Sequence, residues 1–376
     1  MKRYQEALIL KDLAKKMVFL VGPRQAGKTY LAKSIGTHFN HPHYLNYDFQ
    51  EHREIIKKKA WLPRCDLLIF DELHKMPDWK NYLKGVFDTR QPHLNLLVTG
   101  SARMDAFHHT GDSLAGRYFL HHLFPLSLAE LNHLNEPIDM EKLIERSGFP
   151  EPYLAEDVLT GERWRMQYIN SLITTDVLNF ENIHNLKAMQ SVFQLLRQRV
   201  GSPVSYQGMA EDIGISPSTV KKYIEVLEAL YIVFRITPYA KNIARSLLKE
   251  PKIYFFDTAL VKENEGVRFE NLMAASLYKH IYFQQDYFAK PMTLHYLKTK
   301  DHREVDFALA LEGELTHIIE AKNQNKDISK SLHWFQQTCQ VPAIQVVKHL
   351  DQGYVNKNIF LETGLSFLSR LESKEL

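Results

Sequence analysis

The chain has 376 residues, 45% of them hydrophobic and 24% charged, with a formal net charge of +3. This length exceeds the size at which one hydrophobic core stops growing, so we expect two or three domains. The small net charge excludes a general electrostatic argument for nucleic-acid binding. Two cysteines exclude a disulfide framework and fit a reducing compartment. No apolar run approaches the roughly 18 residues that span a membrane, and charges interrupt the N-terminus, so we expect a cytoplasmic protein without membrane contact.

The first strong motif follows an amphipathic helix expected over residues 2–16 and an apolar strand over 17–21. It fits the phosphate-binding pattern G-x-x-x-x-G-K-[ST] (Walker A) at every fixed position and leads into a helical pattern. A strand, a loop and a helix N-terminus direct backbone N–H groups at one point, where a phosphate binds. Lys28 would reach the β- and γ-phosphates of ATP, and the Thr29 hydroxyl would bind Mg²⁺. The predicted ATP-binding residues are Gly22, Pro23, Arg24, Gln25, Ala26, Gly27, Lys28 and Thr29.

A second motif (Walker B) ends a continuous apolar run over residues 67–70, after another expected strand over 44–48 and a basic helix around 57–59. Such a run is typical of a parallel strand that is covered on both faces. Asp71 would hold Mg²⁺, directly or through water, and Glu72 would polarise the attacking water. Adjacent Asp and Glu indicate an ATPase rather than a simple nucleotide holder. The lysines at 57–59 form either a solvated face or a nucleic-acid contact.

A further strand is predicted over residues 94–101, and it ends in polar residues. In this class of fold such a side chain lies between the two motifs and can orient the water; Ser101 is the first candidate and Thr99 the second. The alternative is a strand that simply leaves through a turn. Arg117 could supply charge to the γ-phosphate in a neighbouring subunit, with Arg103 as its competitor and a surface charge as the alternative.

The middle of the chain carries a helix-turn-helix pattern after a break at residues 147–152. A short helix is expected over 207–213 and a longer one over 218–230, separated by a Gly-Ile-Ser-Pro turn. Apolar runs over 231–236 and 253–257 suit the strands of a wing, so the segment is interpreted as a winged helix. It could bind DNA through outward lysines, or it could pack as a lid against an ATPase.

The last third holds two consecutive strands, over residues 304–309 and 316–322. Asp306, Glu320 and Lys322 have the spacing of the PD-(D/E)xK nuclease core, and alternation puts the last two on one strand face. The two carboxylates could hold Mg²⁺ while the lysine positions water for phosphodiester attack. Glu270, on a preceding helix, resembles an extra glutamate of some of these nucleases. The catalytic interpretation has an alternative, a hairpin with a salt-bridged lysine, because Glu-Val-Asp replaces the usual Pro-Asp.

Five segments occur in series: the phosphate loop and residues 70–75, 99–101, 113–117 and 124–127. Together they resemble a prokaryotic AAA-type ATPase family whose members carry a C-terminal domain of unknown function, often regarded as nuclease-like. The resemblance covers nearly the whole chain. It implies an AAA+-related core and Mg²⁺-ATP, and it allows assembly into a homo-oligomer.

The sequence therefore predicts an α/β fold in three parts. An AAA-type P-loop ATPase domain with a parallel sheet occupies residues 1–145, a helical linker and winged helix-turn-helix 146–260, and a PD-(D/E)xK-like α/β domain 261–376. The expected function is ATP hydrolysis coupled to a nucleic-acid-handling domain, with DNA as the partner. The alternatives are a nucleotide-dependent binding or signalling module whose C-terminal domain is inactive, and an ATP-regulated nuclease.

Overall fold

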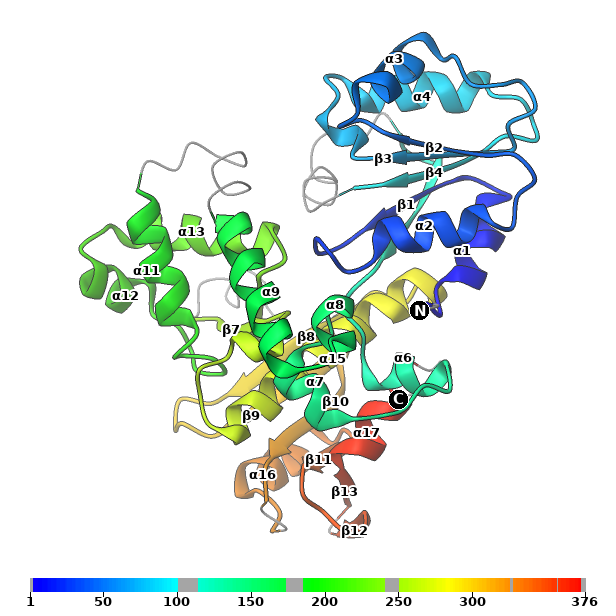
Figure 1. Cartoon of the computed structure of the whole chain (residues 1–376). Helices are drawn as coiled ribbons and strands as arrows, with labels where there is room; N and C mark the ends of the chain where they lie inside the picture. The colour runs from blue at the N-terminus through cyan, green and yellow to red at the C-terminus, as the bar shows by residue number, and fades with distance from the viewer. Residues whose placement is uncertain are drawn as a thin grey trace. The chain divides into compact units, whose positions relative to one another are not determined.

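The computed structural model describes residues 3–100, 114–173, 185–240, 250–324, 327–356 and 358–372. The chain forms two compact units, Met1–Phe124 and Pro125–Leu376, whose elements are labelled in Figure 1. Within the described ranges, no helix is both long enough and apolar enough to cross a membrane.

The first unit is built on five parallel strands in the order β2-β3-β4-β1-β5. Their bounds are β1 (Met17–Val21), β2 (Pro42–Asn46), β3 (Leu67–Asp71), β4 (Asn95–Thr99) and β5 (Tyr118–His122). Both β1 and β3 are buried along their whole length, as a parallel sheet covered on two faces requires. Because β4 lies between β1 and β3, the phosphate loop, Asp71 and Thr99 all lie at the carboxyl edge of neighbouring strands.

Helices cover both faces of this sheet: α1 (Glu6–Leu13), α2 (Lys28–Gly36), α3 (Gln50–Lys58) and α4 (Trp79–Thr89). One apolar cluster joins Ile56 of α3 and Leu83 of α4 to Phe70 of β3. The other joins Ile9 of α1 and Leu31 of α2 to further strand residues. The predicted three-layer arrangement of a P-loop domain is therefore present.

The local predictions for this unit differ from the structure mainly at element ends. The first helix is shorter than expected, and β2 begins two residues before the predicted strand. Strand β5 was not anticipated, since its sequence ends in two histidines. Both are buried, and His121 Nε2 lies 2.9 Å from Asp12 Oδ2, which supplies a polar partner inside the unit.

The second unit contains an eight-stranded mixed sheet in the order β12-β13-β11-β10-β9-β8-β6-β7. The strands are β6 (Val233–Pro238), β7 (Lys252–Phe255), β8 (Met292–Lys298), β9 (Glu304–Leu311), β10 (Glu314–Lys322), β11 (Ala343–Val347), β12 (Tyr354–Asn356) and β13 (Ile359–Thr363). Strands β8, β9 and β10 form an antiparallel meander, and β11 pairs parallel to β10. Helix α15 (Glu265–Phe288) precedes the meander, and α16 (Lys330–Cys339) joins β10 to β11.

Shorter helices precede and close this sheet. They are α6 (Leu128–His133), α7 (Met140–Arg146), α8 (Pro150–Leu154), α9 (Val158–Ser171), α11 (Leu186–Leu196), α12 (Tyr206–Ile213), α13 (Pro217–Ala229) and α17 (Gly364–Arg370). The expected helix-turn-helix is formed by α12 and α13. Gly214 ends α12 at a φ of 76°, and Ser216 caps α13 by accepting from the Thr219 N–H at 3.1 Å.

The two strands predicted to form a wing pair with more than each other. They pair antiparallel as β6 and β7, but β6 also pairs parallel with β8 through Thr237 and His295. The wing is therefore one end of the large sheet rather than a free hairpin. The predicted boundaries at 145/146 and 260/261 both fall inside the second compact unit, so the three-part division stays a prediction.

Candidate functional sites

The phosphate loop wraps around the side chain of Lys28. Its ammonium donates to the carbonyl oxygens of Gly22 at 2.9 Å and Pro23 at 2.6 Å. A Cβ at Gly22, where φ is 140°, would lie 2.2 Å from the Leu123 carbonyl oxygen, so only glycine fits this approach. Burial lowers the pKa of Lys28 to about 8, while Glu72 and Asp71 act in the opposite direction. A bound phosphate would replace neutral carbonyls with an anionic partner for this ammonium.

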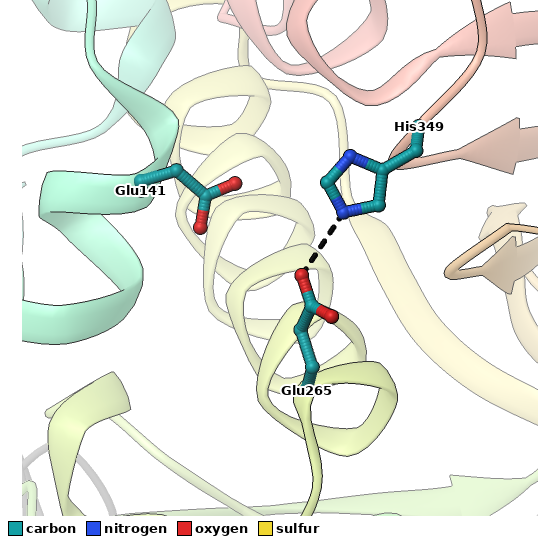
Figure 2. Close-up of side chains that lie close together, drawn as sticks. All are labelled: Glu141, Glu265 and His349. Atoms are coloured by element: carbon teal, nitrogen blue, oxygen red, sulfur yellow. Dashed lines mark hydrogen bonds and ion pairs between the residues drawn. The ribbon is translucent and has the colours of Figure 1, made fainter.

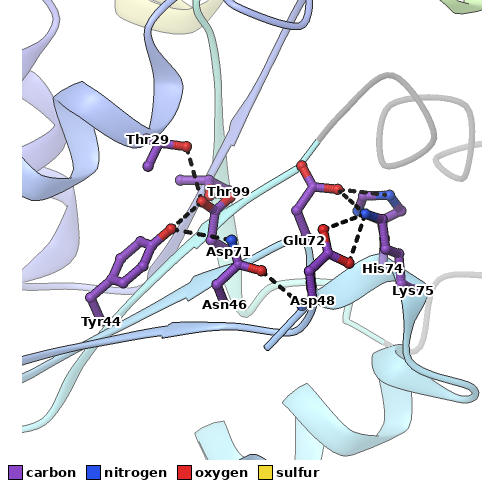
Figure 3. A network of polar contacts seen from close by, with 9 residues as sticks. All are labelled: Thr29, Tyr44, Asn46, Asp48, Asp71, Glu72, His74, Lys75 and Thr99. Carbon is purple, nitrogen blue, oxygen red and sulfur yellow. Dashed lines mark hydrogen bonds and ion pairs between the residues drawn. The ribbon is translucent and has the colours of Figure 1, made fainter. Parts of the chain in front are cut away.

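Asp71 receives three hydroxyl groups from neighbouring elements, as Figure 3 shows. Thr29 Oγ1 donates to Asp71 Oδ2 at 2.9 Å, the Tyr44 hydroxyl donates to the same oxygen at 2.6 Å, and the Thr99 hydroxyl donates to Oδ1. Hydroxyl and carboxylate oxygens are the hard ligands that Mg²⁺ prefers. The donor chemistry of Thr29 and Asp71 therefore fits the predicted metal role.

Glu72 points away from this carboxylate, toward Lys75 and His74 (Figure 3). One of its oxygens lies 3.3 Å from Lys75 Nζ, and Lys75 in turn binds Asp48 at 2.7 Å. The backbone of Glu72 is left-handed, with a φ of 57°. Such a conformation is uncommon outside glycine and is often retained at functional sites. The chain therefore leaves the direction of β3 at Glu72, on the carboxyl edge of the sheet where the phosphate loop also begins.

The remaining predicted residues of the first unit have different positions. Ser101 and Arg103 lie outside the described residues. Thr99 is fully buried and contacts the predicted metal-binding carboxylate, so in this structure it orients Asp71. Arg117 lies at the opposite edge of the sheet, because its carbonyl accepts from the Met17 N–H at the start of β1. Its guanidinium binds Asp88 at 2.8 and 3.1 Å, and a role toward a neighbouring chain stays a prediction.

The predicted nuclease-like residues of the second unit converge. Asp306 on β9 accepts from the Ala321 N–H of β10 at 2.9 Å, and Glu320 lies 2.7 Å from Lys322. Glu270 projects from α15 and accepts from the Tyr254 hydroxyl at 2.7 Å.

Two carboxylates of this cluster are strongly affected by burial. Burial raises the pKa of Glu270 to about 8 and that of Glu320 to about 7, and in both the negative charge of Asp306 adds to the effect. Lys322 and the Ser329 hydroxyl act in the opposite direction on Glu320. Burial and the charge of Asp306 therefore both favour the protonated form of Glu270 and Glu320.

Sequence reasoning missed Lys252, which lies among these carboxylates. Its ammonium is 2.7 Å from Glu304 Oε1 and 3.7 Å from both Glu270 Oε1 and Asp306 Oδ1, and its side chain is 1% exposed. The residue belongs to β7, which was interpreted as part of a wing. The alternation of Lys252 and Tyr254 puts both on one strand face, a signal that could have been noticed.

A second ligand-like group is Glu141, Glu265 and His349, drawn in Figure 2. Among the residues that the structure describes, this is the only set of three or more Asp, Glu, His or Cys side chains whose ligand atoms all lie within 4.8 Å of one another. Lys348 lies 2.9 Å from Glu141 and 2.5 Å from Glu265. Because its ammonium already pairs with both carboxylates, the group is an ion-pair network that joins α7, α15 and the end of β11.

Comparisons with known families cover two segments of the chain. Residues 14–132 match a family described as an AAA domain, and residues 138–270 match a domain of unknown function. The second match covers the middle of the chain and stops at Glu270, so neither match includes Asp306, Glu320 or Lys322.

Proteins with similar sequences are uncharacterized. One from Mycobacterium tuberculosis is 24% identical over 326 residues, which are 84% of this chain and 72% of that protein. A protein of Mycobacterium bovis shows the same values. One from Methanocaldococcus jannaschii is 22% identical over 222 residues, 50% of this chain and 46% of its own.

Solved structures show only distant similarity. A Walker-type ATPase of Pyrococcus abyssi has a TM-score of 0.45 at 14% identity and covers 69% of this chain and 94% of its own. A RuvB variant of Thermotoga maritima has a TM-score of 0.34 at 19% identity, covering 61% and 87%. Scores this low carry no argument about the fold. The match over residues 14–132 does, and together with the strand order and the phosphate loop it supports an AAA-type P-loop fold for the first part of this chain.

Proposed function

We propose that the first unit binds Mg²⁺-ATP and hydrolyses it. The observation that carries this proposal is the hydrogen bond from Thr29 to Asp71 at 2.9 Å, which unites the two motifs at one edge of the sheet. Lys28 would bind the β- and γ-phosphates, and Thr29 and Asp71 would hold the metal ion. Bound Mg²⁺ supplies positive charge for the phosphate oxygens during transfer.

Glu72 is the proposed water-polarising base. Its position directly after Asp71 places it at the same edge, and its left-handed backbone turns its side chain away from the metal ligands. Hydrolysis requires its carboxylate to exchange the contact with Lys75 for one with the attacking water.

Mg²⁺-dependent ATP turnover and nucleotide binding, measured on matched variants, test this assignment. Lys28→Ala should abolish ATP binding, whereas Glu72→Gln should retain it and lower kcat by about 10²- to 10⁴-fold. Lys58→Ala removes an exposed lysine of α3 and is the control, with turnover unchanged. Normal turnover in both site variants would refute the assignment.

The second unit is proposed to handle nucleic acid, DNA in particular, under control of the nucleotide state. Support comes from the succession of α15, the β8-β9-β10 meander, α16 and β11, together with the convergence of Asp306, Glu320 and Lys322. This order of elements is the one expected of a PD-(D/E)xK-like domain, and the helix-turn-helix of α12 and α13 suits a winged-helix partner for DNA. We also propose that the chain forms a homo-oligomer in which Arg117 supplies charge to the γ-phosphate bound by a neighbouring subunit.

One observation favours the alternative, a nucleotide-dependent binding or signalling module. Lys252 already neutralises part of the carboxylate cluster, as it would in a domain that keeps a nuclease-like fold without cleavage.

Cleavage assays separate the two functions. Linear, single-stranded and branched DNA would be incubated with Mg²⁺ or Mn²⁺, with and without ATP. Cleavage that Asp306→Ala abolishes would establish a nuclease, and Lys28→Ala would show whether ATP controls it. If the wild-type protein cleaves none of these substrates but binds DNA or a protein in an ATP-dependent way, the binding module is the function.

A further inference from the structure

The carboxylate cluster of the second unit contains its own cation, and the inference drawn from it rests on the proposed nuclease-like site. The Lys252 ammonium lies within 3.7 Å of Glu270, Glu304 and Asp306 and is shielded from solvent. The Tyr296 ring lies 5.4 Å from the same ammonium and provides a further favourable surface for a positive charge. A buried ammonium needs such partners, because burial without them is costly.

Glu270 is enclosed on the side of this ammonium. Its Oε1 accepts from the Tyr254 hydroxyl, and a Cβ built at Gly201 would lie 2.7 Å from the same oxygen. Glycine at position 201 therefore allows the carboxylate to pack directly against the backbone. Glu270 is held by the fold and by Lys252, which leaves little room for an ion beside it.

Glu320 differs from Glu270 in this respect. Its Oε1 binds Lys322 at 2.7 Å, while its Oε2 is buried and has no partner of normal hydrogen-bond geometry among the described residues; the nearby Ser329 hydroxyl acts on the pKa of the carboxyl group as a whole. Buried acceptors without a partner are rare and indicate a missing ligand, ion or water. Asp306, on the adjacent strand, is a carboxylate that could share such a ligand, since it contacts the Ala321 N–H next to Glu320.

We propose that Lys252 takes the place of a second metal ion, so that this site binds a single divalent cation between Asp306 and Glu320. A two-metal site needs ions about 3.5–4 Å apart that share several carboxylates. In the described part of the chain, no three carboxylates of this cluster bring ligand atoms within 4.8 Å of one another. Lys252 is thus a positioning residue that fixes Glu270, Glu304 and Asp306, and Lys322 remains beside the cation for water.

The test counts bound Mn²⁺ by electron paramagnetic resonance, with Mn²⁺ alone and no DNA. The full chain would carry Thr29→Ala, which removes a predicted metal ligand of the phosphate loop. One magnetically isolated Mn²⁺ per chain is expected. Glu320→Gln should weaken its binding at least about tenfold. Lys252→Met should allow a second Mn²⁺ with spin coupling to the first, whereas Lys252→Arg should keep one.

Lys298→Met is the matched control, because Lys298 binds the same Glu304 at 3.0 Å from the more exposed side and should leave the count at one. Two spin-coupled Mn²⁺ ions in the Thr29→Ala chain that keeps Lys252 would overturn the inference while leaving a nuclease-like metal site in place. No bound Mn²⁺ would overturn both the inference and that site. If Lys252→Met fails to fold, as circular dichroism would show, the number of Mn²⁺ ions bound by the Thr29→Ala chain that keeps Lys252 decides.

Discussion

The polar centres of the two units surround their aspartates in different ways. Asp71 is surrounded by the neutral hydroxyls of Thr29, Tyr44 and Thr99, which orient the carboxylate and leave its charge for a metal ion. Asp306 faces the ammonium of Lys252, a charge supplied by the protein itself. The first centre is therefore completed by its ligand, and the second contributes to the stability of its unit before any ligand binds.

The largest effect, on the unfolding free energy, is expected for a buried ion pair of the second unit. Lys279 lies 2.6 Å from Glu130, and both side chains are buried. Lys279→Met would remove this ammonium from the buried carboxylates of Glu130 and of Glu372, which lies 3.8 Å from it, and this costs about 3–5 kcal/mol of unfolding free energy. Urea unfolding of the variant beside the wild type measures this loss.

Two comparisons make that result specific. The exposed pair of Lys58 and Glu54, 3.0 Å apart, contributes little in water, so Lys58→Met should change the unfolding free energy by less than about 1 kcal/mol. The double variant Lys279→Met/Glu130→Met should recover part of the loss, because it removes the buried charge of Glu130 and leaves only that of Glu372. A Lys279→Met protein as stable as the wild type would contradict internal neutralisation.

A smaller but still large effect should come from a neutral imidazole in the same unit. His280 is buried, and burial lowers its pKa to about 4, with His317, Arg370 and Lys290 adding to the shift. As the pH falls from about 6.5 to 4, the unfolded chain binds a proton that the folded chain does not. The unfolding free energy should therefore fall by about 3 kcal/mol across this window and be unaffected by this group above it.

The measurement is unfolding in urea at several pH values. His280→Gln removes the titrating group and should flatten this part of the profile, while the decline from other groups persists. An identical profile in the variant would show that His280 is not the source.

In the first unit, removing a hydrogen-bond partner of the Asp71 carboxylate should lower ATP turnover more than it lowers the unfolding free energy. Thr99→Val removes the hydroxyl that orients Asp71 while keeping the shape of the side chain. We expect a roughly tenfold fall in ATP turnover, the value of one hydrogen bond to a charged group. Steady-state kinetics at varied Mg²⁺ would show it as a raised Mg²⁺ requirement. Thr89→Val, at an exposed position of α4, is the control, and equal kinetics in both variants would refute the role.

Local motifs allowed the elements of the first site to be predicted. In the second site, Lys252 was missed because its contacts are distant in sequence. The phosphate loop and the strand before Asp71 each carry their signal within a few residues, so their elements and edge could be predicted. Asp306, Glu320 and Lys322 were predicted from the spacing of the PD-(D/E)xK pattern, and strand alternation put the last two on one face. Lys252 was not, because its meaning depends on Glu270 and Glu304, which are distant in sequence. The pairing of β6 with β8 likewise has no local signal, so the wing was expected to be free.

The smallest predicted effect concerns the lysine that contacts Glu72, and it sharpens the difference between the centres. Lys75 is 40% exposed, and its contacts with Glu72 at 3.3 Å and Asp48 at 2.7 Å are those of a surface ion pair. Such pairs contribute about 0.2–1 kcal/mol, so freeing Glu72 by Lys75→Met should raise ATP turnover by no more than about fivefold. Lys75→Arg keeps the charge and should leave turnover near the wild-type value. A fall in turnover in Lys75→Met would instead mean that Lys75 supports Glu72 during hydrolysis, as Lys252 holds the carboxylates of the second centre.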